Sequence, residues 1–171
     1  MIHTLRIGPL KAKPLTAEAF APYGDVIETS EMADQFSINY GNTTRYNDLM
    51  QMDVADEGGV PCVNIFRSHP LPQPVTIKIM ENHPLGSQAF VPLSGRPYLV
   101  VVAEAGPFVA ANIKAFLAGS NQGVNYHKGV WHHYCLALDK TSDFLVIDRK
   151  GKGKNCVEYL LSATEQVVIS L

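Results

Sequence analysis

Short apolar segments separated by glycine, proline, asparagine and aspartate make up most of this chain. β-Branched and aromatic residues are frequent in these segments and turn-forming residues bound them, a pattern that predicts β-strands. Many short strands at near-regular spacing are typical of a β-sandwich or β-barrel. The predicted strands cover residues 25–29, 60–67, 75–81, 88–92, 98–103, 132–138, 144–149, 157–161 and 166–171.

Helical signals are few. Thr16 is a suitable N-cap for a helix that Pro22 and Gly24 end, and Asn112 is a suitable N-cap for a second helix, over residues 112–119. Both helices are expected to lie outside a β core. The least apolar segment, residues 41–59, is expected to pass over a pocket or to form an arm that faces a partner.

Composition indicates one ordinary globular domain, residues 1–171, with a sizeable core. The chain is 46% hydrophobic and 18% charged, and its formal net charge is −2. It has no cluster of lysine and arginine residues, which argues against nucleic acid or an anionic membrane as a partner.

The cysteines and the longest apolar runs bear on the compartment. Cys62, Cys135 and Cys156 are an odd number of widely spaced cysteines, which indicates neither a disulfide framework nor a zinc knuckle. The longest purely apolar run is too short to span a bilayer. The sequence therefore predicts a soluble protein in the cytoplasm.

Candidate chemistry begins where a predicted strand changes from apolar to polar. Because alternate residues of a strand face the same side, Ile77, Ile79, Glu81 and His83 are expected in one row. Gln88 and Phe90 share a face of the next strand. Polar groups at the end of an apolar row are what the mouth of a barrel pocket requires.

A second polar group is expected about forty residues later, around Gly129. Alternation places His132 on one face with Tyr134, Leu136 and Leu138, and Trp131 and His133 on the other. We therefore expect His132 to point inward, and Trp131 and His133 to be structural or to lie at a subunit contact.

The spacing of these residues is similar to that of the cupin superfamily. Glu81, His83, Gln88 and Gly95 follow the H-x-H-x4-E-x6-G part of the first cupin motif, with two ligand types changed. His127, Gly129 and His132 follow the P-x-G-x2-H part of the second motif, with histidine in place of proline. Across nearly the whole chain, the segments MENHPLGSQAFVPL, QGVNYHKGVWHH, DFLVIDR, NIFRS and NTTRYNDL resemble the ureidoglycolate lyase family.

This resemblance implies both a fold and a function. The fold is all-β, a cupin-type double-stranded β-helix (jelly-roll barrel) with a few short peripheral helices. The function is cleavage of (S)-ureidoglycolate to glyoxylate and urea during allantoin catabolism. The resemblance also implies a nickel-dependent homodimer.

The site residues are expected to divide between metal binding and proton transfer. Glu81, His83, Gln88 and His132 form a set that suits nickel, zinc or manganese. The alternative is that they only hydrogen-bond one another at a barrel rim. Glu81, His83 and His132 are also the catalytic candidates, and Tyr126, beside His127, either carries a proton or packs as a rim aromatic.

Two arginines are candidates for the substrate carboxylate, since a guanidinium donates hydrogen bonds to both carboxylate oxygens. Arg67 follows the expected inward residues Val63 and Ile65, and Arg45 lies in the polar segment; each either reaches the pocket or stays at the surface. Gln88 is a further substrate-binding candidate. The remaining predictions are that Asp148 pairs with Arg149 at a strand end and that His3 and His69 lie at the surface.

Other functions remain open at this point. One is a cupin enzyme of different chemistry, and another is a small-molecule binding protein without turnover. A third is a ureidoglycolate hydrolase that releases ammonia and carbon dioxide. The products formed from ureidoglycolate separate these possibilities.

Overall fold

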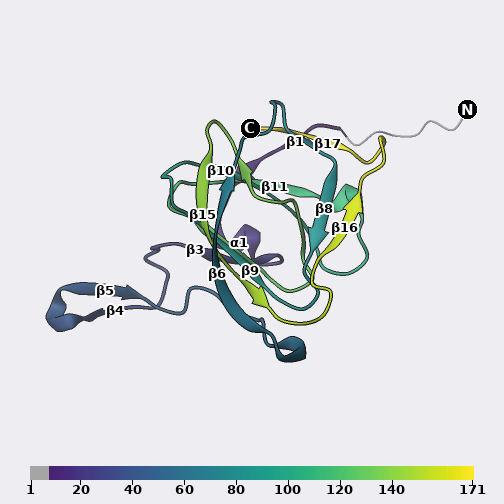
Figure 1. Ribbon diagram of the computed structural model, residues 1–171. Helices are drawn as coiled ribbons and strands as arrows, with labels where there is room; N and C mark the ends of the chain where they lie inside the picture. The colour runs from purple at the N-terminus through teal and green to yellow at the C-terminus, as the bar shows by residue number, and fades with distance from the viewer. Residues whose placement is uncertain (1–7) are drawn as a thin grey trace, which may run out of the picture.

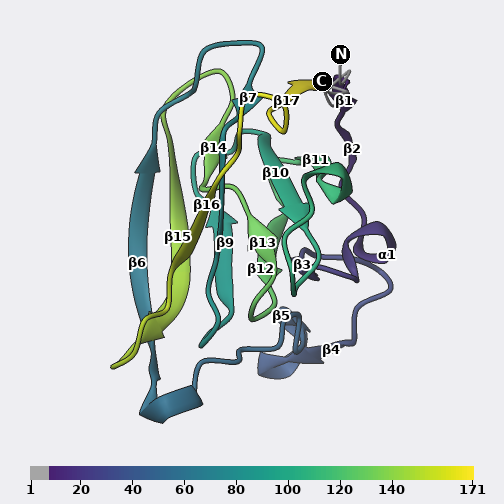
Figure 2. The same cartoon turned by 90° about the vertical axis from the view of Figure 1, so that its right-hand side faces the viewer.

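Two sheets that face each other form the body of the molecule in the computed structural model, which describes residues 8–171 (Figures 1 and 2). In the first sheet the strand order is β3-β12-β9-β15-β6, with every neighbouring pair antiparallel. Its strands are β3 (Gly24–Ile27), β12 (Gly123–Tyr126), β9 (Gln88–Pro92), β15 (Ser142–Lys150) and β6 (Val60–Ser68).

The second sheet has the order β16-β8-β13-β10-β11-β2, and β14 also pairs with β10. All of its pairs are antiparallel except β11 with β2. Its strands are β16 (Val157–Leu160), β8 (Ile79–Asn82), β13 (Trp131–His132), β10 (Tyr98–Ala103), β14 (Leu136–Ala137), β11 (Lys114–Ala118) and β2 (Lys13–Pro14).

Two hydrophobic cores lie on opposite sides of the second sheet. The first, the inner core, fills the space between the sheets, where the ring centroids of Tyr98 and Phe144 are 5.1 Å apart. The second, the outer core, lies outside the second sheet and is covered by a small sheet of β1 (Leu10–Lys11), β17 (Val167–Ser170) and β7 (Thr76–Ile77). Because β10 separates the two cores, both of its faces are buried, which explains its unbroken apolar sequence YLVVVA.

The predicted all-β, cupin-type fold is confirmed, and so is the first helix. Thr16 precedes α1 (Ala17–Phe20), and its hydroxyl oxygen accepts a hydrogen bond from the amide of Ala19 at 3.2 Å. The second predicted helix is wrong, because residues 114–118 form β11 and only a short 3₁₀ turn, η3 (Ala110–Asn112), precedes it. Pairing with β10 along the whole of β11 overrides the local cap signal.

Two predicted strands are each interrupted, which changes the faces that their residues occupy. His132 pairs with Val102 but Leu136 pairs with Leu99, so one extra residue is inserted between β13 and β14. As a result Leu136 and Leu138 lie in the outer core, and their predicted place on the face of His132 is wrong. The interruption between β7 and β8 likewise places Ile77 in the outer core, away from the row of Glu81.

A hairpin projects from the barrel. It comprises β4 (Gln35–Ile38), the 3₁₀ turn η1 (Asn39–Gly41) and β5 (Thr43–Tyr46), and its two strands pair only with each other (Figure 1). The chain then returns along the first sheet through η2 (Asp56–Gly58), held by the hydrogen bond from the amide of Asp53 to the hydroxyl of Ser87. Residues 41–59 thus form part of an arm and part of a strap along the end of this sheet where β9 begins.

Two further observations concern the ends of the chain and its helices. The predicted surface position of His3 lies outside the described residues. Within residues 8–171, no helix is both long enough and apolar enough to cross a bilayer.

Candidate active site

Polar side chains from both sheets meet at one end of the barrel interior. Pairing sets their direction: His132 is directly opposite Glu81, and Tyr126 is directly opposite Gln88. The site therefore brings together most of the residues that the sequence singled out, and it adds one from β15. Its members are Glu81, His83, Gln88, Tyr126, His132 and Asp148.

His83 is held in a defined orientation by its two ring nitrogens. Nδ1 faces the backbone carbonyl of Asn155 at 2.5 Å, and since a carbonyl only accepts, Nδ1 carries the proton. Nε2 lies 3.2 Å from Oε1 of Gln88, whose amide nitrogen donates to Asp148 at 3.1 Å. In the neutral ring a lone pair of Nε2 therefore faces a lone pair of Oε1 of Gln88, an arrangement that a bound cation stabilises.

His132 is buried and stacked flat on Tyr126, with ring centroids 4.2 Å apart and planes 4° from parallel. Burial lowers the pKa of His132 from 6.5 to about 3, so the ring is neutral at physiological pH. Its Nδ1 faces the carbonyl of His133 at 3.2 Å and Oε1 of Glu81 at 3.8 Å, whereas its buried Nε2 has no hydrogen-bond partner. An unpartnered imidazole nitrogen inside a barrel is a good metal ligand.

Glu81 is a carboxylate in a partly buried position. Burial raises the pKa of Glu81, His83 opposes this rise, and the neighbouring carboxylate of Glu158 adds to it. The thiol of Cys156 donates to Oε2 of Glu81 at 3.8 Å. A carboxylate whose pKa is moved toward neutrality is suited to take up and release a proton near physiological pH.

These residues fit a divalent metal. Ligand atoms of Glu81, His83 and His132 all lie within 4.8 Å of one another, and Oε1 of Gln88 lies 3.2 Å from Nε2 of His83. The hydrogen bond from Nδ1 of His83 to a backbone carbonyl is the usual outer contact of a metal-binding histidine. The donor set of two imidazoles, one carboxylate and one amide oxygen suits nickel, zinc or manganese.

Asp148 and Asn155 are site residues that the sequence predictions missed. Asp148 was expected to pair with Arg149, but its carboxylate accepts hydrogen bonds from the Gln88 side chain and the Arg149 backbone amide. The guanidinium of Arg149 instead donates to the carbonyls of Asp56 and Lys152. Alternation along β15 gives the signal for Asp148, because Phe144 and Val146 face the inner core.

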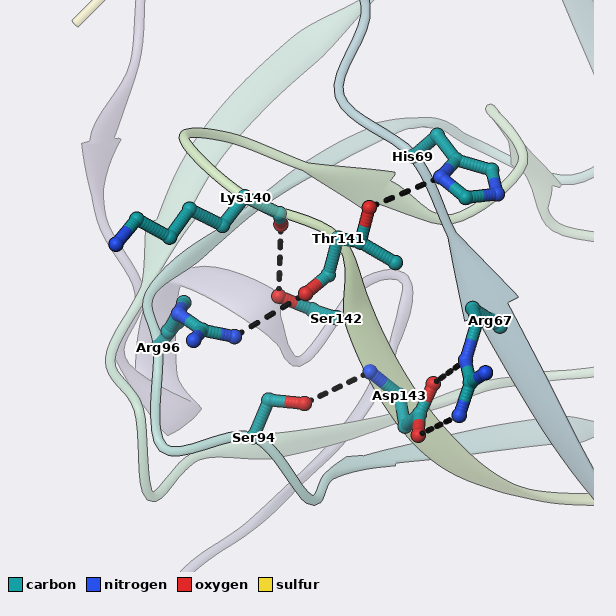
Figure 3. Close-up of polar contacts among 8 residues, drawn as sticks. All are labelled: Arg67, His69, Ser94, Arg96, Lys140, Thr141, Ser142 and Asp143. Atoms are coloured by element: carbon teal, nitrogen blue, oxygen red, sulfur yellow. Dashed lines mark hydrogen bonds and ion pairs between the residues drawn. The ribbon is translucent and has the colours of Figure 1, made fainter.

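Neither arginine candidate contacts this cluster within one chain. Arg67 forms a double hydrogen bond with Asp143, at 2.8 and 3.0 Å, close to the contacts of Arg96 and His69 with Thr141 (Figure 3). It shares the outer face of β6 with Val63 and Ile65, which are 65% and 57% exposed. Their predicted inward orientation is therefore wrong. Arg45 lies on β5 of the projecting hairpin, with its guanidinium 5.7 Å from the ring centroid of Phe36.

The remaining histidines lie outside the cluster. His133 is buried, its Nδ1 faces the carbonyl of Tyr134, and it lines a separate hollow of about 270 Å³ with Leu71 and Ile79. His127 lies at the rim, where its Nε2 is 3.2 Å from a carboxylate oxygen of Asp25.

The fold and the site together define a class of protein. Two facing sheets enclose imidazole, carboxylate and amide groups at one end of their interior, which is the arrangement of a cupin-type enzyme acting on a small molecule. The family model described as ureidoglycolate lyase matches residues 7–169. The chain belongs to the ureidoglycolate lyase family.

Several relatives carry the name "Ureidoglycolate lyase". One from Burkholderia mallei is 57% identical over 149 residues, which cover 87% of each chain. One from Pseudomonas paraeruginosa is 50% identical over 161 residues, covering 94% of this chain and 95% of the relative. One from Pseudomonas syringae pv. tomato is 48% identical over 161 residues, covering 94% of each chain.

Proposed function

We propose that this protein is a lyase that cleaves (S)-ureidoglycolate into glyoxylate and urea in the breakdown of allantoin. The observation that carries the proposal is the cluster at the barrel end, where a carboxylate with a raised pKa lies beside two imidazoles. The chain that carries this cluster is a member of the ureidoglycolate lyase family.

The reaction moves one proton and breaks one bond. The central carbon of the substrate carries a hydroxyl group, a ureido nitrogen and a carboxylate. When the hydroxyl loses its proton, the oxygen forms the carbonyl of glyoxylate, and the electron pair of the carbon–nitrogen bond leaves with the nitrogen. That nitrogen takes a proton and becomes part of urea, so no water is consumed.

Glu81 is our candidate for this proton transfer. One carboxylate oxygen accepts the hydroxyl proton, and the resulting carboxylic acid delivers a proton to the departing nitrogen. In the metal-free site the raised pKa of Glu81 suits both halves of this cycle. Gln88 and His83 orient the substrate beside it. Burial raises the pKa of Tyr126 well above its usual range, so Tyr126 keeps its proton and acts mainly by packing on His132.

Glu81, His83, Gln88 and His132 are our candidates for holding a divalent metal, with nickel as the first candidate. Such an ion, when bound, polarises the hydroxyl oxygen and stabilises its negative charge. Chelation is expected to abolish activity reversibly, with nickel or manganese restoring it. Full activity in protein shown by elemental analysis to be free of metal contradicts the metal role and leaves Glu81 and His83 as an acid–base pair.

A product assay tests the proposed function. Incubation with ureidoglycolate is expected to release urea and glyoxylate in equal amounts without ammonia, and His132→Ala is expected to abolish the release. Ammonia and carbon dioxide in place of urea identify a hydrolase. Binding of ureidoglycolate without any product identifies a binding protein.

The quaternary structure and the compartment belong to the same proposal. We infer a homodimer, because the projecting hairpin exposes Phe36 and Tyr40, and its strands β4 and β5 form a sheet of their own in the described part of the chain. Sedimentation that shows only monomer at working concentration contradicts it. We also infer a cytoplasmic enzyme, since Cys62, Cys135 and Cys156 are all free thiols.

A further inference from the structure

The proposed substrate carries a carboxylate, but the cluster in one chain gives it no arginine or lysine. Within residues 8–171, the polar contacts of Glu81, His83 and Asp148 are made to imidazole, amide, thiol and backbone groups. Two of these residues are carboxylates themselves and repel an anion. Since the proposed metal is assigned to the hydroxyl oxygen, the carboxylate is best matched by an arginine from another part of the structure.

Three of the arginines in the described part of the chain are already engaged. Arg67 is paired with Asp143, and Arg96 donates to the carbonyl of Thr141. Arg149 is buried and donates to two carbonyls, with Gly59 packed so closely that an added Cβ would lie 2.4 Å from its Nε. Arg45 differs from all three: its guanidinium is exposed on the hairpin and rests over the ring of Phe36.

The hairpin that carries Arg45 stands away from its own barrel. Figure 2 shows it near the end of the barrel where the chain passes from β12 to β13, and Figure 1 shows it pointing outward from there. Tyr40 at its tip is fully exposed. An isolated two-stranded hairpin is only marginally stable in water, so contact with a second chain would stabilise it. The contact that the Arg45 guanidinium makes is with Phe36 of the same hairpin, and the hairpin projects from its own barrel.

The barrel leaves an open side at the edge strands β16 and β6, which are not paired with each other. Leu160 lies on the face of β16 that also carries Glu158, which is directly opposite Glu81. Phe66 faces the interior from β6 and contacts the ring of Phe90. Despite these orientations, Leu160 is 76% exposed and Phe66 is 38% exposed. Apolar side chains that face a barrel interior and remain exposed indicate a surface that another chain covers.

We propose that a second copy of this chain lays its hairpin, residues 35–46, along this open side and supplies Arg45 to the substrate carboxylate. The aromatic rings of the hairpin meet the exposed apolar residues of the two edge strands, and its guanidinium meets an acidic site that binds an anion. Two-fold symmetry lets each copy give one hairpin and receive one. This inference rests on the proposed lyase function and adds to it that the site is completed between subunits.

Steady-state kinetics test the role of Arg45. Because the contact is made equally in the ground state and the transition state, Arg45→Ala is expected to raise KM about tenfold to a hundredfold with kcat changed much less. Arg45→Lys is expected to recover part of the loss. Arg96→Ala is the matched control, since it also removes an arginine from outside the cluster, and it is expected to keep the parent KM. An unchanged KM in Arg45→Ala overturns the inference.

Mixing two defective variants tests whether Arg45 acts across the dimer. Arg45→Ala and His132→Ala are unfolded together, refolded together and assayed at a substrate concentration far below KM. With random pairing, about half of the dimers contain one chain of each variant, and each of these mixed dimers has one complete site out of two. About a quarter of all sites are then complete, so about a quarter of the parent activity is expected. If the refolded mixture recovers no activity while Arg45→Ala alone still shows a raised KM, Arg45 does not act between subunits and the inference is overturned. If the parent protein, assayed alongside, releases no urea, the proposed function has failed instead.

Discussion

The two ends of the barrel interior are built from the same strands but differ in chemistry. On β15, Phe144 and Val146 are fully buried in the inner core, and two residues further along Asp148 belongs to the polar cluster. On β9, Phe90 packs in the core and Gln88 joins Asp148. Distance along a strand thus decides whether an inward side chain packs or binds, and the apolar end fixes the backbones that present the polar end.

The largest effect on activity is expected when His132 and His133, two neighbouring histidines, are replaced one at a time. His132→Ala removes a buried ring of the cluster, and activity is expected to fall by about a hundredfold to ten-thousandfold, the range of a proton-transfer or charge-stabilising group. His133→Ala removes a buried ring outside the cluster and is expected to lower stability while kcat stays within a few-fold of the parent. Urea release and thermal unfolding of both variants provide the measurement. Equal losses of activity in the two variants would contradict the assignment of His132 to the cluster and of His133 to a position outside it.

The apolar end is tested by Phe144→Ala. Phe144 is fully buried and contacts the rings of Tyr98 and Phe90, so its truncation is expected to lower the free energy of unfolding by about 3 to 5 kcal/mol. The activity of the molecules that remain folded should be largely retained at low temperature. Urea denaturation gives the free energy of unfolding, and active-site titration gives the activity of the folded molecules. A stable Phe144→Ala protein without activity would show that the two ends are not separate in function.

Asp148→Asn probes the polar end without disturbing the core. The change keeps the size of the side chain but weakens the hydrogen bond that orients Gln88, so kcat/KM is expected to fall about tenfold to a hundredfold. The carboxylate of Asp148 also helps to raise the pKa of Glu81, so the acidic limb of the pH–rate profile should move to lower pH. Loss of stability by more than about 1 kcal/mol, with an unchanged profile, would point to a purely structural role.

Lowering the pH is expected to have a smaller effect, on the free energy of unfolding. Burial lowers the pKa of both His132 and His133, so in the folded state these rings stay neutral, whereas in the unfolded state they take up protons below about pH 6.5. The stabilisation is therefore complete above pH 6.5 and is lost as pH falls, by up to about 1.4 kcal/mol per pH unit for His132, and the lowered pKa of His133 acts in the same direction. Urea denaturation of chelated protein between pH 7.5 and 5 measures this slope, which His133→Gln should reduce. Stability independent of pH in this range would contradict neutral burial.

Much of this arrangement could be predicted from alternation and spacing. The strands through Gln88, Tyr98 and Phe144 follow a regular pattern, and the inward positions of Glu81 and His132 follow from it. Insertions of single residues could not be predicted, because a bulge leaves no clear mark in composition, and one such insertion moved Leu136 to the outer core. The outward orientation of Val63 and Ile65 was missed for a related reason: on an edge strand, apolar residues occur on the exposed face as well.

The most direct test of the central claim, cleavage by proton transfer without water, is the fate of oxygen from labelled water. Ureidoglycolate is turned over in H₂¹⁸O by the parent protein, with His132→Ala as the inactive control, and the released urea is analysed by mass spectrometry. The account predicts urea that contains only the unlabelled oxygen of the substrate, formed in proportion to the amount of protein. Ammonia and carbon dioxide formed in place of urea would contradict it.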